Sequence, residues 1–140
     1  MGEFVRDPNH WLFKMSPAEW IRAGLGEVAR AETALSHGDA RGGTAGLKRG
    51  AGMALNGALI LEPEDAWGRT YVEHLKGLAS DSRVPEAVRL ASQRVLDAVP
   101  PAGEVVILRT PRAHATIVDA ARDVIAHAWV VVQRHEKSPM

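Results

Sequence analysis

Apolar residues recur at steps of three and four through most of this chain, and that period belongs to the α-helix. The first stripe consists of Ile21, Leu25, Val28, Ala31 and Leu35. Similar spacing predicts helices over residues 16–37, 39–61, 65–80 and 111–136, and a fourth helix that opens at Pro85 and closes at Pro100–Pro101. Because short loops join them, we expect an all-α, up-and-down helical bundle of four to five helices.

Local signals mark where these helices begin and end. Ser16-Pro17-Ala18-Glu19 has the pattern of a capping box with proline at the first helical position. His37-Gly38 is typical of a helix C-terminus, and Asp39 can cap the second helix. These signals support the predicted boundary between the first two helices.

The chain has 140 residues, which is the length of one domain. We expect an N-terminal arm over residues 1–15, with the aromatic cluster Trp11, Leu12 and Phe13, and a single helical domain over residues 16–137. The run Val105–Leu108 is strand-like, but it is too short and too solitary to imply a sheet.

Composition excludes several classes of protein. Acidic and basic residues each total 17, so no net charge attracts the chain to nucleic acid or to an anionic membrane, and any RNA binding must be local. Without cysteine, disulfides, thiolate metal sites and thiol nucleophiles are excluded. No apolar run approaches the roughly 20 residues that span a bilayer. We therefore expect a soluble, cytoplasmic protein with no membrane partner and no cofactor.

The glycine-rich segment over residues 41–52 invites a phosphate-loop interpretation, but it matches neither a Walker nor a dinucleotide pattern. Gly42, Gly46 and Gly50 are four apart, which favours a strip along which a neighbouring helix approaches closely. The alternative is a local contact with nucleic-acid phosphates, made by Arg41, Lys48 and Arg49.

Two further groups of residues could form a site or could belong to ordinary helix surfaces and packing. Asp119, Asp123 and His127 are four apart and share a helix face, which would suit a metal, but no Glu-x-x-His motif accompanies them and an acidic surface is the simpler interpretation. Trp20, Trp67, Trp129 and Tyr71 lie on or beside helical stripes. We expect these aromatic residues in the core and not in a base-stacking platform.

The final helix carries the sharper signal. On a helical wheel, Arg122 and His127 lie on opposite rims of its apolar face, about 140° apart. That face consists of Ile117, Ala121, Val124, Ile125, Ala128 and Val132. One helix does not bring its own Arg122 and His127 together, but two copies can meet across a twofold axis, because an isologous interface places the same patch opposite itself.

The segment from Arg122 to His127 fits the pattern R-x4-6-H with a polar residue directly after the arginine. The spacing alone also fits Arg30–His37, Arg69–His74 and Arg109–His114. Only the first pair lies within the final helix with an aspartate, Asp123, beside the arginine. Here the chain resembles the HEPN superfamily, small all-helical domains often found as ribonuclease toxins. The resemblance covers roughly residues 16–137, from the capped first helix to the motif on the last.

The resemblance implies a homodimer, paired through the terminal helix, whose composite cleft cleaves RNA without a metal. Its catalytic residues would be Arg122, Asp123 and His127, and an antitoxin would be a further partner. In family toxins regulated by a nucleotidyltransferase, a tyrosine two residues after the histidine is modified, whereas Trp129 stands here and has no hydroxyl. The alternative is a HEPN-like module that binds a nucleotide, RNA or protein without catalysis, with His127 hydrogen-bonded at a helix interface.

Overall fold

The computed structural model describes residues 15–98 and 111–136, and the side chains of all of these except residues 65, 111–114 and 136. The elements are α1 (Pro17–Ser36), α2 (Ala40–Leu61), the 3-10 helix η2 (Asp65–Trp67), α3 (Tyr71–Ser80), α4 (Glu86–Asp97) and α5 (Pro111–Glu136). The described residues contain no strand, and the predicted all-α helical bundle is confirmed. The predicted arm up to residue 14, the run at 105–108 and Pro100–Pro101 lie outside the described residues.

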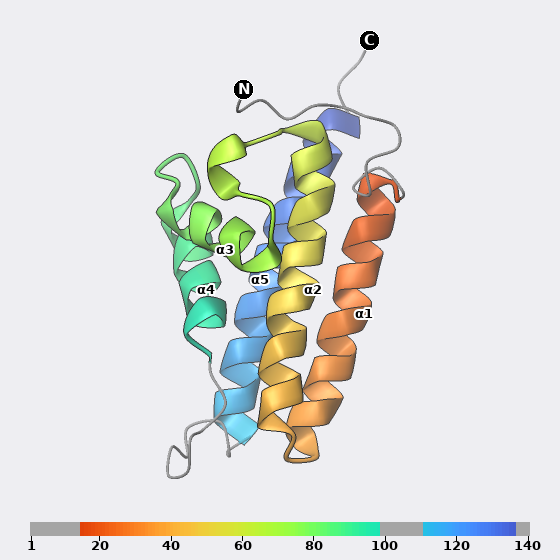
Figure 1. Cartoon of the computed structure of the whole chain (residues 1–140), viewed down its shortest axis with the longest axis vertical. Helices are drawn as coiled ribbons and strands as arrows, with labels where there is room; N and C mark the ends of the chain where they lie inside the picture. Colours follow the sequence, from red (N-terminus) through yellow and green to blue (C-terminus); the bar gives the residue numbers. More distant parts are fainter. Residues whose placement is uncertain (1–14, 99–110, 137–140) are drawn as a thin grey trace.

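Three long helices, α1, α2 and α5, lie side by side and form the body of the bundle (Figure 1). The shorter helices α3 and α4 pack on each other, against α2 and α5, on the side away from α1. As a result α5 has neighbours on both flanks, α1 on one and α4 on the other.

The predicted ends of the first two helices are confirmed. Ser16 caps α1: its hydroxyl accepts a hydrogen bond from the Glu19 amide at 3.1 Å, and the Glu19 carboxylate accepts one from the Ser16 amide at 2.8 Å. The helix stops before Gly38, whose φ of 85° lies in the left-handed region that favours glycine. Asp39 then caps α2 by accepting from the Gly42 amide at 2.9 Å.

The prediction of one continuous helix over residues 65–80 is wrong. The chain forms η2, turns at Gly68 with a φ of 71°, and starts again as α3. Thr70 and Glu73 form a second capping box, because the Thr70 hydroxyl accepts from the Glu73 amide and Glu73 accepts from the Thr70 amide, each at 3.1 Å. Pro85, expected as the first residue of the fourth helix, is instead the residue that directly precedes α4.

Glycines allow the close contact between α1 and α2, as expected, but Gly42 is not one of them. A Cβ atom added to Gly46 would lie 2.9 Å from the Cβ atom of Ala31, and one added to Gly50 would lie 2.7 Å from the Gly24 carbonyl oxygen. Gly42 instead lies beside the carboxylate of its capping residue, Asp39. The predicted strip is therefore correct at two positions and wrong at the third.

The apolar stripes of all five helices meet in one core. Its fully buried side chains include Val28, Leu35, Leu47, Leu55, Leu75, Leu78, Val95, Val124 and Val132. Trp20 and Trp67 are buried as expected, and Tyr71 is half-buried. The expected burial of Leu25 and Trp129 is wrong, because they are 43% and 38% exposed on the surface between α1 and α5.

Candidate functional site

Arg122 and His127 line different hollows, one on each flank of α5. The guanidinium of Arg122 points toward α1, where it donates a hydrogen bond to the Glu32 carboxylate at 2.9 Å. His127 lies on the other flank and faces the region around η2 and the turn before α4. Within one protomer, the structure therefore does not bring the two motif residues together.

The hollow beside Arg122 is an apolar groove of about 350 Å³, which we call the Trp129 groove. It is lined by Ala18, Ile21, Arg22, Leu25, Arg122, Ile125, Ala126 and Trp129. Its two charged lining residues are both arginines. Leu25 and Trp129 are exposed here because α1 and α5 alone do not cover their side chains.

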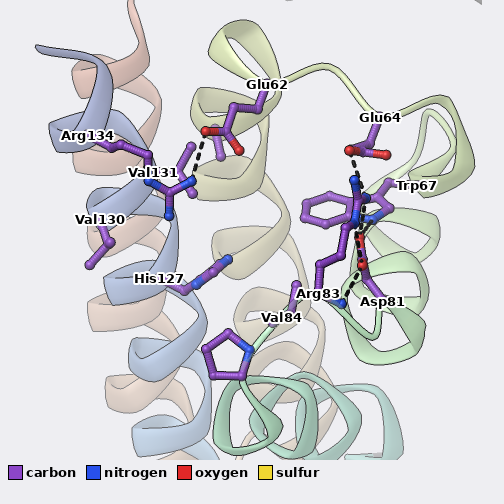
Figure 2. Close-up of a pocket in the computed structure, with 12 residues that line it drawn as sticks. Glu62, Glu64, Trp67, Asp81, Arg83, Val84, His127, Val130, Val131 and Arg134 are labelled. Atoms are coloured by element: carbon purple, nitrogen blue, oxygen red, sulfur yellow. Dashed lines mark hydrogen bonds and ion pairs between the residues drawn. The ribbon is translucent and has the colours of Figure 1, made fainter. Parts of the chain in front are cut away.

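The hollow beside His127 is larger and more polar than this groove, with a volume of about 410 Å³, and we call it the His127 pocket (Figure 2). It is lined by Ala58, Glu62, Glu64, Trp67, Asp81, Arg83, Val84, Pro85, His127, Val130, Val131 and Arg134. These residues come from α2, from α5 and from the segments before α3 and α4. Its lining includes three carboxylates and two arginines, which leaves one excess negative charge while His127 is neutral.

On the α2 side of the pocket, one carboxylate holds two residues from the last turn of α5. Glu62 accepts a hydrogen bond from the Arg134 guanidinium at 3.0 Å, and Nε2 of His135 lies 2.8 Å from the same oxygen. Figure 2 shows the contact between Glu62 and Arg134 above His127. These contacts tie the C-terminal end of α5 to the end of α2.

On the opposite side of the pocket, Arg83 joins two carboxylates. Its guanidinium lies 2.8 Å from Glu64 and 2.6 Å from Asp81, and the indole N–H of Trp67 donates to Asp81 at 3.3 Å. The hydrogen bonds from Arg83 hold the pKa of Asp81 down at about 2. Asp81 is therefore ionised at neutral pH and fixes Trp67 at the edge of the pocket.

His127 is half-buried between these two groups, and in the described part of the chain its ring makes no hydrogen bond to protein. Burial lowers the pKa of the imidazole, and the nearby Arg134 lowers it further. A neutral imidazole with an unpaired ring nitrogen can accept a proton, which is the first requirement of a general base.

The third motif residue, Asp123, is exposed and forms no ion pair with Arg122 or any other described residue. Asp119 is exposed as well. Over residues 15–98 and 111–136, no group of three or more His, Asp or Glu side chains is arranged to hold a metal ion. The metal site considered from the spacing of Asp119, Asp123 and His127 therefore finds no support in these residues.

The three basic residues considered for phosphate contact lie along α2, and none of them lines either hollow beside α5. Arg49 donates to Glu27 of α1 at 2.9 Å. Arg41 is exposed near the start of α2 and Lys48 is half-buried two turns later. They do not contribute to the region around the motif.

One polar contact in the core was not predicted from the sequence. His74 of α3 is buried, with Nδ1 2.9 Å from the Trp67 carbonyl oxygen and Nε2 2.9 Å from the Asn56 amide oxygen of α2. Asn56 is a polar residue within the apolar run of α2, and this position could have indicated a buried polar contact. The contact fixes η2, and with it Trp67, beside the His127 pocket.

None of the described helices is both long enough and apolar enough to cross a lipid bilayer. Comparison of the chain with protein-family models, with curated proteins and with solved structures found no significant match.

Proposed function

We propose that this protein is a HEPN-like, metal-independent endoribonuclease that acts as a homodimer paired through α5. One observation carries the proposal: Arg122 and His127 lie on opposite flanks of the exposed face of the same helix. An active site that needs both residues can be completed only when a second copy brings its own flank to the first.

The two side chains suit the two tasks of metal-free RNA cleavage. His127 is the general base: its neutral imidazole takes the proton from a ribose 2′-hydroxyl, whose oxygen then attacks the adjacent phosphorus. The bond from phosphorus to the 5′-oxygen breaks, a 2′,3′-cyclic phosphate is left, and the 5′-oxygen takes up a proton from the imidazolium. Arg122 stabilises the negative charge that grows on the phosphate oxygens. The exposed pair between Arg122 and Glu32 is weak enough for the guanidinium to exchange partners.

The second candidate is a HEPN-like module that binds a ligand without catalysis. The excess negative charge of the His127 pocket favours it, because carboxylates repel a phosphodiester. If this candidate is right, the protein still binds its ligand when Arg122 is replaced. The native protein then does not cleave RNA.

RNA cleavage in EDTA by the native protein and by Arg122→Ala and His127→Ala separates these candidates. We expect cleavage by the native protein and a loss of about 10²- to 10⁴-fold in each variant. Arg94→Ala and His37→Ala remove exposed residues outside both hollows and should retain native activity. Equal cleavage by all five proteins, or none by the native protein, contradicts the proposal.

A further inference from the structure

The exposed face of α5 is a narrow line of side chains between two unlike flanks. Asp119, Ala126 and Gln133 are seven residues apart, so they follow one line along the helix with a drift of about 20° per step. Asp119 and Ala126 are exposed and Gln133 is half-buried. Ala126 lies at the middle of the line, where a small side chain allows a second helix to approach closely.

The flanks differ in charge. The Trp129 groove has Arg22 and Arg122 among its lining residues and no carboxylate, and Glu32 beside it pairs with Arg122. The flank of the His127 pocket has three carboxylates against two arginines, and the unpaired Asp123 lies on the same side of the line. With Glu32 counted, the first flank has one excess positive charge, whereas the second flank, with Asp123 counted, has two excess negative charges.

A twofold axis can pair two copies of α5 in two ways. When the helices run antiparallel, each flank meets its own copy, so that arginine faces arginine and His127 faces the partner's His127. When they run parallel, the axis lies along the helices and each flank meets the opposite flank. Only the parallel arrangement joins a positive flank to a negative one, and it does so twice.

We propose that the occupant of the exposed α5 face is a second copy of this chain with its α5 parallel to the first. Arg122 then lies at nearly the same height as the partner's Asp123, and about 7.5 Å along the axis from the partner's His127. The axes of two packed helices are also about 8–10 Å apart, so the arginine and histidine side chains together have to bridge the gap. This inference rests on the proposed function, which already gives a second copy as the partner. It adds that the two α5 helices run parallel and that Arg122 pairs with the partner's Asp123.

The surface between the flanks is apolar enough to be buried in such a pair. Val130, on the side of His127, is 51% exposed, and Trp129, on the side of Arg122, is 38% exposed. In the parallel arrangement the two residues approach each other across the axis. Their burial would stabilise the dimer by removing apolar surface from water, in addition to the two ion pairs between Arg122 and the partner's Asp123.

Single cysteines test the direction of the helices, because the native chain contains none. Asp119→Cys and Gln133→Cys place thiols 14 residues apart, about 21 Å along α5. An equimolar mixture of the two variants is treated with a short bismaleimide, and the linked peptides are identified by mass spectrometry. We expect each variant to link to its own kind, whereas Gln93→Cys on the exposed side of α4 should stay unlinked.

Charge reversal tests the ion pair between protomers. We expect Arg122→Asp and Asp123→Arg each to weaken dimerisation by about tenfold or more, because like charges then meet. The double variant R122D/D123R should recover most of the native affinity, as measured by analytical ultracentrifugation. A double variant weaker than both single variants contradicts the pairing.

The outcomes separate this inference from the proposed function. Links found only between position 119 and position 133 show antiparallel helices and overturn the inference. The proposed ribonuclease function still stands in that case if H127A has lost RNA cleavage. Self-links at both positions without RNA cleavage support the parallel dimer and overturn the ribonuclease. A monomer without links shows that no second copy covers this face, and overturns both.

Discussion

Nε2 of His74 lies 2.9 Å from the side-chain amide of Asn56, in the core between α2 and α3. Nδ1 of His74 donates to the Trp67 carbonyl oxygen, so a neutral ring has no proton left for Nε2. With the amide oxygen toward Nε2, Nδ2 of Asn56 is buried without a partner. Rotating the amide lets Nδ2 donate to Nε2, and this satisfies the ring and the amide nitrogen with a neutral histidine.

Burial lowers the pKa of His74, which makes folding sensitive to acid. Because the folded-state pKa lies below the unfolded value of about 6.5, the contribution is complete above pH 6.5 and is lost as the pH falls through the folded-state pKa. We expect His74→Gln to lower the free energy of unfolding at pH 7 by about 1–3 kcal/mol. The variant should also lose less stability than the native protein between pH 7 and pH 5.

Urea unfolding at several pH values measures this effect. His37→Gln is the control for replacing an exposed histidine, because His37 lies at the end of α1, and it should change the free energy of unfolding at pH 7 less than His74→Gln does. Identical pH dependence in His74→Gln and the native protein would show that His74 is not neutral and buried in the folded protein.

Gly24 and Gly26 lie two residues apart on α1 and should respond oppositely to alanine. A Cβ atom on Gly24 would meet the carbonyl oxygen of Gly50, which is backbone and cannot move aside, so we expect a loss of about 1–3 kcal/mol. The nearest atoms to a Cβ on Gly26 are the Arg30 guanidinium nitrogens at 3.8 Å. Gly26→Ala should therefore be neutral or stabilising by up to about 1 kcal/mol. Thermal unfolding of both variants decides the point, and equal destabilisation contradicts the α1–α2 packing.

Glu32 pairs with Arg122 in the isolated protomer, but both side chains are about half exposed. Such pairs contribute little, so Glu32→Gln should change the free energy of unfolding by less than about 0.5 kcal/mol. RNA cleavage should not fall, because the proposed role of Arg122 lies across the dimer. A large loss of activity in Glu32→Gln, with the fold intact, would mean that Glu32 holds Arg122 in its working position.

The lowered pKa of His127 determines how RNA cleavage should vary with pH. A general base acts in its neutral form, so the rate should rise as the pH increases through a value below 6.5 and then level off. Initial rates measured from pH 4.5 to pH 8 at constant ionic strength test this expectation. A rate that falls over this range would assign His127 the role of general acid instead.

Trp129 should matter for association and little for the fold. Because it is partly exposed beside the line of contact, Trp129→Ala should weaken dimerisation by about 30-fold, the effect of losing an aromatic anchor worth about 2 kcal/mol. Leu90→Ala is a matched control, since Leu90 is exposed on α4. Sedimentation over a range of protein concentrations compares the two, and equal effects would remove Trp129 from the interface.

Local signals in the sequence predicted where α1 and α2 begin, because the capping contacts of Ser16 and Asp39 join residues only three apart. The break before α3 was equally predictable from Thr70 and Glu73, a capping box that the apolar spacing over residues 65–80 concealed. Helical geometry also indicated that Arg122 and His127 lie on opposite sides of one helix. All of these features depend only on residues within a few turns of the same helix.

Tertiary packing decided the surroundings of those residues. The His127 pocket joins α2, α5 and two connecting segments, and the burial of His74 depends on Asn56, 18 residues away. Periodicity places Trp129 beside the apolar stripe but does not say how far α1 covers it. Local sequence thus specified the helices and the faces of α5. Which side chains on those faces are buried, paired or left open depends on how the neighbouring helices pack, because burial requires contacts between distant segments.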